Sequence, residues 1–300
     1  MKRREFLEKS AAIGILAAIP SSVAWGATVH PGAASAPVGR IEPPAEGSIP
    51  VAFLVSDGAV VIDFCGPWEV FQDAYIPGRK DAAFRLYTVA ETATPIRTSG
   101  GMKIVPDYTF ASAPAPKVIV IPAQSAGSDA TLAWIRQAAK TADVTMSVCT
   151  GAFLLARTGL LAGKAATTHH ASFKPFAMRF PDVKLERGAR FVDEGRLASA
   201  GGLSSGIDLA LHVVERYFGR EAAEGTAFYM EYQGKGWREP GSNAVYAKDF
   251  VSTDARPLCA VCGMDVDKAK SPRSVYGGKT YYFCGPDHKQ QFDQAPGRWV

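Results

Sequence analysis

The sequence predicts a three-layer α/β domain with a mainly parallel sheet, followed by a small cysteine-rich α+β module. Continuous apolar runs without alternation occupy residues 49–57, 83–91, 117–123 and 143–149, as is typical of strands covered on both faces. Segments with helical periodicity alternate with these runs, which favours a parallel sheet. Three of the five cysteines follow residue 257, in a stretch too short to form a large core.

Helical segments complete the predicted α/β domain, which we expect over residues 49–233. The predicted helices are residues 66–75, 130–140, 152–163 and 205–219. The first opens with Gly-Pro, and the last is strongly apolar and ends at a glycine. In such a sheet, ligands bind beyond the carboxyl ends of the strands.

Residues 1–26 have the organisation of an export signal, with a basic start, an apolar run of about ten residues and a small-residue end. Arg3 and Arg4, followed by Phe6 and Leu7, resemble the twin-arginine signal, which predicts export of the folded protein to the bacterial periplasm. The apolar run is too short to cross a bilayer, so we expect no membrane span after cleavage. A basic amphipathic start on a cytosolic protein is the alternative.

Two stretches with little apolar periodicity, residues 27–48 and 234–256, are interpreted as linkers. The formal net charge is +4, and half of it lies in the first 26 residues. With 47% hydrophobic and 21% charged residues, the composition is that of a globular protein and gives no sign of a nucleic-acid partner.

Cys149 stands where a predicted strand meets a predicted helix, with Thr150 and Gly151 forming the turn. The free N–H groups of the helix start favour an anionic sulfur, so we expect the pKa of this thiol to fall and its nucleophilicity to rise. The same N–H groups would stabilise an oxyanion formed after attack. The alternative is a buried structural cysteine that only packs well.

Several segments resemble, in order along the chain, the DJ-1/PfpI superfamily. They are VIDFCGPWEVF at 61–71, SVCTGAFLLARTGLLAGKAATTHH at 147–170, GGLSSGIDLALHVVERYFG at 201–219 and MEYQ at 230–233. More narrowly, they are similar to the branch that contains isonitrile hydratase and the amidase-like sensor domains of AraC-type transcription regulators. The resemblance implies the flavodoxin-like fold of class I glutamine amidotransferases, no cofactor for the α/β domain, a small-molecule substrate or ligand, and homodimers as a frequent state.

Carried over by position, the resemblance implies that Cys149 is the nucleophile and that the hydroxyl and amide of Thr150 assist it. Asp63, in the D-x-x-G-P motif, matches the acid beside the nucleophile. Like-charge repulsion from a thiolate should raise the pKa of this carboxyl, so we expect Asp63 to stay protonated and to deliver and retrieve the proton of a hydration. His169 matches the histidine of a TTHW motif as a substrate-binding candidate, and His170 replaces the tryptophan.

The chain departs from the family pattern after the strand that ends near residue 121. Ala123 and Gln124 stand where the family commonly has Gly-Gly, whose backbone helps to bind an anionic centre, and we expect them to alter this part of the substrate site. Cys65 lies two residues after Asp63, on the same side of an extended chain. We expect it to pack, and a regulatory disulfide with Cys149 is the alternative hypothesis.

The last stretch, residues 257–300, contains Cys259 and Cys262 as C-x2-C and Cys284 and His288 as C-x3-H. Three thiolates and an imidazole suit a tetrahedral zinc or copper(I) ion, and a disulfide of Cys262 with Cys259 or Cys284 is the alternative. The stretch resembles the YHS domain, related to the TRASH motif, which usually has cysteine in place of this histidine and Asp-Pro in place of Cys-Ala at 259–260. The aromatic residues expected to form the small core are Tyr281, Tyr282, Phe283, Phe292 and Trp299.

Two functions follow from these patterns. The first is a periplasmic cysteine-dependent hydratase or hydrolase of the isonitrile hydratase type, acting on a small carbon–nitrogen compound, to which the metal module would bring a metal-bound isonitrile. The second is a non-catalytic periplasmic protein that binds or senses a ligand or a metal, favoured by the altered Ala123-Gln124 segment. Protease or deglycase activity fits less well, because those branches place a glutamate near the thiol where this chain has Asp63.

Overall fold

The structure is a computed structural model that describes residues 39–248 and 251–299. The expected twin-arginine signal, residues 1–26, and residues 27–38 of the expected first linker lie outside the described residues. In the described ranges, no helix combines the length and the apolar character that crossing a membrane requires. The α/β domain and the C-terminal module are each described by themselves.

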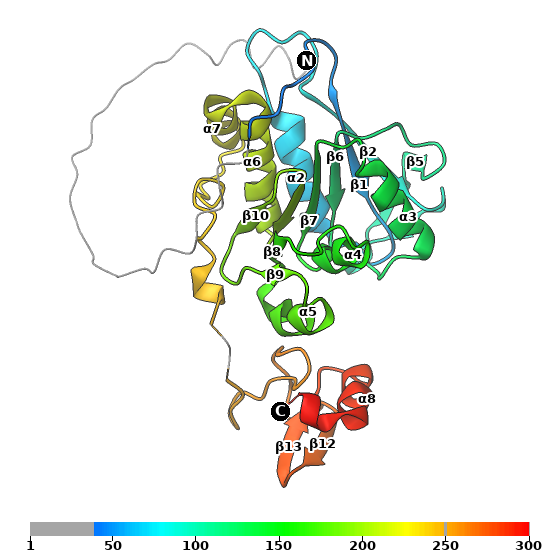
Figure 1. The fold of residues 1–300 in the computed structure, drawn as a ribbon, viewed down its shortest axis with the longest axis vertical. Helices are drawn as coiled ribbons and strands as arrows, with labels where there is room; N and C mark the ends of the chain where they lie inside the picture. Colours follow the sequence, from blue (N-terminus) through cyan, green and yellow to red (C-terminus); the bar gives the residue numbers. More distant parts are fainter. Residues whose placement is uncertain (1–38, 249–250, 300) are drawn as a thin grey trace, which may run out of the picture. The chain divides into compact units, whose positions relative to one another are not determined.

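A seven-stranded sheet forms the centre of the α/β domain, in the order β10-β11-β7-β6-β1-β2-β5 (Figure 1). Its strands are β1 (Ile49–Leu54), β2 (Phe84–Ala90), β5 (Tyr108–Thr109), β6 (Val118–Ile121), β7 (Val144–Val148), β10 (Phe191–Asp193) and β11 (Leu197–Ala200). All neighbours pair in parallel except β10 and β11. Val51 of β1, for example, lies beside Leu86 of β2 and Val118 of β6. The sheet confirms the predicted flavodoxin-like α/β fold.

Helices cover both faces of this sheet, so the domain has three layers (Figure 1). One face packs against α2 (Val61–Asp73), α6 (Ser205–Phe218) and α7 (Arg220–Tyr229). The other packs against α3 (Asp129–Ala138), α4 (Gly151–Arg157) and α5 (Phe173–Arg179). Two short strand pairs lie outside the main sheet, β3 (Ile96–Arg97) with β4 (Lys103–Ile104) and β8 (Ala165–Ala166) with β9 (Lys184–Leu185).

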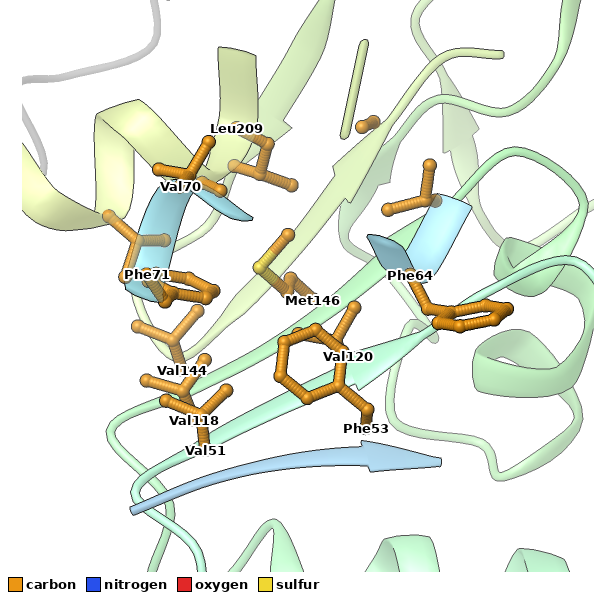
Figure 2. Packing of buried hydrophobic residues seen from close by; sticks show 14 of the residues in the cluster. Val51, Phe53, Phe64, Val70, Phe71, Val118, Val120, Val144, Met146 and Leu209 are labelled. Atoms are coloured by element: carbon orange, nitrogen blue, oxygen red, sulfur yellow. The ribbon is translucent and has the colours of Figure 1, made fainter. Parts of the chain in front are cut away.

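The two cores follow from the alternation of strand side chains. Val118 and Val120 of β6 belong to the core beneath α2 and α6, whereas Ile119 and Ile121 belong to the core beneath α3 and α4. Figure 2 shows the first core, in which side chains of neighbouring strands pack against the helices. The labelled residues are Val51, Phe53, Phe64, Val70, Phe71, Val118, Val120, Val144, Met146 and Leu209. Strands buried on both faces explain why their sequences show no polar alternation.

The start of α2 differs from the prediction. The helix begins at Val61 rather than at residue 66, and it contains Pro67. A proline in a helix lacks the N–H that would bond the carbonyl four residues earlier. Here Phe64 and Phe71 bury their rings on the sheet, 3% and 1% exposed, and this burial outweighs the lost bond. The early start puts Asp63 in the first helical turn.

Residues 234–247, which the sequence places in a linker, pack against the α/β domain. Trp237 is 3% exposed, and its backbone N–H donates to the carboxylate of Asp208 on α6 at 2.9 Å. Asn243 is also buried and accepts a hydrogen bond from Arg190. Glycine, proline and polar residues fill every position of 234–243 except 237, so periodicity could not reveal that the indole of Trp237 anchors this stretch.

The C-terminal module contains a hairpin of β12 (Arg273–Tyr276) and β13 (Lys279–Tyr282), followed by α8 (Pro286–Gln294). Its core consists of Val261, Phe283 and Phe292 with two cysteines, and Tyr281 and Trp299 pack on it. Tyr282, expected in this core, is half-buried outside the cluster. Such a small core needs further stabilisation. Four short 3₁₀ helices complete the described chain, at Ser99–Gly101, His170–Ser172, Ala244–Tyr246 and Pro296–Arg298.

Candidate functional site

The carboxyl ends of β11, β7, β6 and β1 meet at one edge of the sheet, where parallel sheets bind ligands. Cys149 directly follows β7, Ala123 lies two residues beyond β6, and Asp63 lies in the helix that follows β1. The fold brings these three residues together although 60 and 26 positions separate them along the chain. Leu203, in the loop after β11, also reaches this edge.

Cys149 forms a sharp corner between β7 and α4. Its φ of 58° is in the left-handed region, which costs a non-glycine residue about 1–3 kcal/mol and is held only by the surrounding structure. Its N–H donates to the carbonyl of Gly201 at 2.9 Å, and its carbonyl accepts from the hydroxyl of Thr168 at 2.9 Å. At Gly151, an added Cβ would lie 2.1 Å from the carbonyl oxygen of Ile121, so only glycine lets the helix start here. Thr168 belongs to the quoted TTHH segment, but nothing in its type or spacing marked it as a support for the corner.

Asp63 is fully buried beside this corner. Its Oδ2 accepts the backbone N–H of Ala123 at 3.1 Å, and its carboxyl group lies close enough to the Cys149 thiol for each group to shift the pKa of the other. Its Oδ1 is buried and has no hydrogen-bond partner within residues 39–248 and 251–299. A buried carboxyl oxygen without a partner is costly, so it is expected at a site that serves a reaction or a ligand.

The expected fall in the pKa of Cys149 is wrong. Burial and the negative charge of Asp63 raise the pKa of this thiol to about 12, and they outweigh the N–H groups of Thr150 and Leu203 that donate to the sulfur. Burial also raises the pKa of Asp63 to about 6, although the bonds from Ala123 and Cys149 lower it. Between these values the pair holds one proton, shared between a carboxyl group and a thiol.

The proton of this pair therefore has a different position from the one the sequence suggested. We expected a protonated Asp63 beside a thiolate; the raised pKa of Cys149 instead favours a carboxylate that accepts the thiol proton near neutral pH. The N–H of Thr150 lies at the sulfur as expected, whereas its hydroxyl makes no capping hydrogen bond. The Leu203 N–H was not foreseen, because only the fold brings that loop to the thiol.

The Ala123-Gln124 segment is fixed to the end of β1. The N–H of Ala123 is bonded to Asp63, so this amide serves the carboxylate rather than the sulfur. The side chain of Gln124 donates to the carbonyl of Leu54 at 3.1 Å and accepts from the Ser56 hydroxyl at 2.8 Å. The segment thus supports the acid, and its side chains join two neighbouring loops.

His169 lies against the loop after β11. Its Nδ1 accepts the N–H of Ala171 at 3.3 Å, which leaves its proton on Nε2. A Cβ at Gly202 would lie 2.2 Å from the Cδ2 of this ring, so the imidazole packs directly on the glycine. Burial, and then the neighbouring His170, lower the pKa of His169, which keeps the ring neutral. The two rings pack with centroids 4.3 Å apart.

Cys65 is a half-buried free thiol on α2. The disulfide hypothesis treated residues 63–65 as extended, with Asp63 and Cys65 on one side. In the helix that the structure shows, the two side chains diverge by about 200° around the axis, so the basis for pairing Cys65 with Cys149 is lost. Burial, and then Glu69, raise the pKa of Cys65.

The C-terminal module brings the four predicted metal ligands together. The ligand atoms of Cys259, Cys262, Cys284 and His288 all lie within 4.8 Å of one another. The Nδ1 of His288 is 3.0 Å from the sulfur of Cys284 and 3.5 Å from that of Cys259, and the sulfurs of Cys262 and Cys284 are 3.6 Å apart. Tetrahedral zinc, with bonds of about 2.0–2.3 Å, separates its ligand atoms by about 3.5–3.8 Å.

Electrostatics also suit a cation at this cluster. All three cysteines are free thiols rather than disulfides. The Cys262 thiol and nearby N–H groups donate to the sulfur of Cys259 and lower its pKa to about 4, whereas this contact raises the pKa of Cys262. The geometry and donor set therefore fit a soft or borderline ion such as zinc or copper(I).

Comparison with known proteins identifies both parts of the chain. The model of the DJ-1/PfpI family matches residues 50–216. The chain belongs to the DJ-1/PfpI family. The model of the YHS domain matches residues 260–300, which include three of the four clustered ligands. This DJ-1/PfpI protein therefore joins an α/β domain that carries a buried cysteine to a module suited to bind metal.

Relatives of this DJ-1/PfpI protein include an enzyme and transcriptional regulators. Isonitrile hydratase of Pseudomonas putida is 31% identical over 196 residues, which are 62% of this chain and 79% of that protein. The HTH-type transcriptional regulator GbdR of Pseudomonas aeruginosa is 26% identical over 188 residues, 61% of this chain and half of the regulator. A ThiJ/PfpI family protein from Pseudomonas syringae has a similar structure, with a TM-score of 0.57 and 26% identity over 69% of this chain and 84% of that one.

Proposed function

We propose that the α/β domain is a cysteine-dependent hydratase or hydrolase that acts on a small carbon–nitrogen compound, with an isonitrile as the first candidate substrate. The contact between the Cys149 thiol and the buried Asp63 carboxyl is the observation that carries this proposal. It provides a nucleophile and a group that moves protons at the carboxyl ends of the strands. The similarity to isonitrile hydratase over most of the length of that enzyme supports the choice of substrate.

The Asp63–Cys149 pair suits the addition of a thiol to the terminal carbon of an isonitrile. The sulfur forms a bond to that carbon while the proton shared with Asp63 moves to the same carbon, which gives a thioimidate R–N=CH–S on Cys149. Water then adds to this carbon and a proton reaches the nitrogen. Cleavage of the C–S bond releases R–NH–CHO and returns the proton to the pair, so water is the only co-reactant.

The test is to incubate the full chain with an alkyl isonitrile and to measure the N-substituted formamide by mass spectrometry. We expect product with the natural sequence and only background with Cys149→Ala or Asp63→Asn. Absence of product from the natural sequence, or equal product from Cys149→Ala, would reject the proposal.

Binding without catalysis is the second candidate function, and the environment of Cys149 favours it in one respect. Cys149 is only 8% exposed, and the pKa of its thiol is raised to about 12. A protonated, buried thiol of this kind could line a ligand-binding site without acting as a nucleophile. The similarity to the regulator GbdR supports a sensing role. Tight binding of the isonitrile by calorimetry, without formamide, would support this second function.

We also propose that Cys259, Cys262, Cys284 and His288 hold one metal ion, zinc or copper(I), in the C-terminal module. The ion would link the turn that carries Cys259 and Cys262 to the start of α8. Such a link would stabilise a module whose hydrophobic core is small. Metal analysis of the full chain, purified with zinc or with copper(I) under reducing conditions, should give one ion per chain. An absence of both ions together with a disulfide among these cysteines would reject this site.

Export to the periplasm is a further proposal, supported by the Arg3-Arg4 pattern in the first 26 residues. In this proposal cleavage removes residues 1–26, and the exported part includes the α/β domain and the metal module. Fractionation of a Gram-negative host should find the natural sequence in the periplasm and the Arg3→Lys, Arg4→Lys double variant in the cytoplasm. Equal distribution of the two would contradict it.

A further inference from the structure

We propose that residues 236–246, which follow the part of the chain matched by the DJ-1/PfpI model, form a clamp that positions the Cys149 corner. The clamp contacts the loop after β11, residues 201–204, and its positioning residues are Asn243 and Tyr246. The inference rests on the proposed function only in taking Cys149 as the reactive residue. Its test measures the protection of backbone amides and needs no substrate, so the clamp and the proposed function can fail independently.

The clamp is anchored to the α/β domain at its start. Trp237 is 3% exposed, and its backbone N–H donates to the buried carboxylate of Asp208. An added Cβ at Gly236 would lie 2.9 Å from side-chain atoms of both Arg190 and Asp208, so the clamp backbone packs directly on this ion pair. The N–H of Arg190 in turn donates to the carbonyl of Pro240. The clamp therefore starts from a fixed position on α6 and on the residue before β10.

The first contact of the clamp with the loop after β11 is made by Asn243, a buried residue. Its Oδ1 accepts a hydrogen bond from Nη1 of Arg190 at 3.3 Å. An added Cβ at Gly201 would lie 2.8 Å from the Nδ2 of Asn243, so this side chain packs directly on the glycine. The carbonyl of Gly201 accepts the N–H of Cys149 at 2.9 Å. A single residue of the loop thus connects Asn243 to the strained corner.

The second contact is a stack of three rings that starts at Tyr246. The rings of Tyr246 and His170 stack with centroids 5.1 Å apart and an angle of 24° between their planes. The ring of His170 packs in turn on that of His169, with centroids 4.3 Å apart. His169 lies directly on Gly202, where an added Cβ would be 2.2 Å from its ring. The stack therefore ends on the residue next to Gly201.

The exposure of Tyr246 and the strain at Cys149 give these contacts a positioning role. Tyr246 is 44% exposed, so its ring contributes little to the hydrophobic core. Cys149 has a φ of 58°, a conformation that persists only where the surrounding structure holds it. The hydrogen bond from Cys149 to Gly201 is one of these restraints. Movement of residues 201–204 should therefore release the corner.

The direct test is hydrogen–deuterium exchange of the full chain at pH 7, with mass spectrometry of peptic peptides that cover residues 147–152 and 199–206. Tyr246→Ala removes the outer ring of the stack, and we expect about fivefold faster exchange in both peptides. Tyr246→Phe keeps the ring and should restore the natural exchange rate. Val245→Ala is the matched control, because it shortens an exposed side chain of the same 3₁₀ turn and should leave the exchange unchanged.

A second pair of variants tests the contact made by Asn243. Asn243→Ala should speed exchange in the peptide over 147–152 about tenfold, whereas Ser242→Ala, at an exposed neighbouring position, should leave it unchanged. Exchange in β2, residues 84–90, should stay natural in every variant, because the clamp does not contact this strand.

Three results would overturn the inference. The first is natural exchange over 147–152 in folded Tyr246→Ala and Asn243→Ala. The second is an equal rise in β2, since global destabilisation would then explain the effect. The third is exchange in Tyr246→Phe as fast as in Tyr246→Ala, because the ring itself would then not position the corner.

Discussion

The chain uses cysteine in two contrasting surroundings. Cys149 is a single thiol beside one buried carboxyl group, and its pKa is raised to about 12. Cys259 lies among two further thiols and an imidazole, and its pKa is lowered to about 4. In the proposed function, Asp63 takes the proton of the first sulfur at the moment of attack, whereas the second sulfur binds a cation. On this proposal the neighbours, rather than the residue type, decide between nucleophile and ligand.

The two sites also differ in how the chain builds them. The ligands Cys259 to His288 come from one stretch of thirty residues, held by a turn and the start of a short helix. The groups around Cys149 come from the ends of β1, β6, β7 and β11, and so from residues 63–203. A local site can keep its function when the rest of the chain changes, but the Cys149 site requires the whole sheet.

The largest expected effect is on formamide production, and it should distinguish Cys149 from Cys65, another thiol of the same domain. Cys149→Ala should lower formamide production by about 10³-fold or more, because it removes the atom that bonds to substrate. Cys65→Ala, on the diverging face of α2, should retain the activity. The comparison is made with purified full-length variants at equal concentration, by product assay. A similar loss with both variants would mean that the buried Asp63–Cys149 pair is not the centre of the reaction.

The next effect concerns the metal cluster. Cys262→Ser should weaken metal binding about a hundredfold or more, because one of four ligands is replaced by a poor one. Metal competition with a chromophoric chelator measures the affinity, and limited proteolysis after residue 256 reports on the fold of the module. Cys65→Ser provides the control with the same chemical change. Unchanged metal affinity in Cys262→Ser would show that this cysteine is not a metal ligand.

A smaller effect on stability should accompany the loss of activity in Asp63→Asn. Burial raises the pKa of Asp63 from 3.8 to about 6, so the folded state binds its proton more tightly than the unfolded chain does. The resulting stability is present below pH 4 and is lost as the pH rises through 6. We therefore expect Asp63→Asn to stabilise the fold by about 2 kcal/mol at pH 7 and by little at pH 4, in urea titrations of the free energy of unfolding. Destabilisation at pH 7 would contradict the unfavourable burial of this carboxylate.

The sequence predicted the large features of the fold because strong apolar patterns specify them. Runs such as 117–123 and 143–149 contain β6 and β7, and the helical period of 205–219 matches α6 closely. The short strands β10 and β11 were not predicted, because their three and four residues show no distinct apolar pattern. The start of α2 was placed too late, because the Gly66-Pro67 pair suggested a helix start where tertiary packing supports a helix interior.

The sequence predicted some parts of the candidate site and not others. Motif resemblance suggested that Asp63 and Cys149 act together, and the structure brings them into contact. The direction of the Cys149 pKa could not be predicted from the helix start alone, because it depends on burial and on a charge that only the fold brings near. The position of the Leu203 amide near the Cys149 sulfur could not be found from sequence, since a backbone donor has no residue type. The four candidate metal ligands could be predicted from their spacing, because they lie close together along the chain.

The pH dependence of Cys149 labelling tests the shared proton of the Asp63–Cys149 pair most directly. Labelling of Cys149 by iodoacetamide is measured from pH 5 to pH 10, for the natural sequence and for Asp63→Asn. Mass spectrometry follows the tryptic peptide 141–157, which contains a single cysteine. If the pair holds one proton, the rate of the natural sequence should rise through an inflection near pH 6, because the thiolate arises by proton transfer to Asp63. It should rise again only at higher pH, where direct ionisation of a thiol with a pKa of about 12 contributes. The rate of Asp63→Asn should instead climb with pH without an inflection near pH 6. Identical curves for the two proteins would contradict the account.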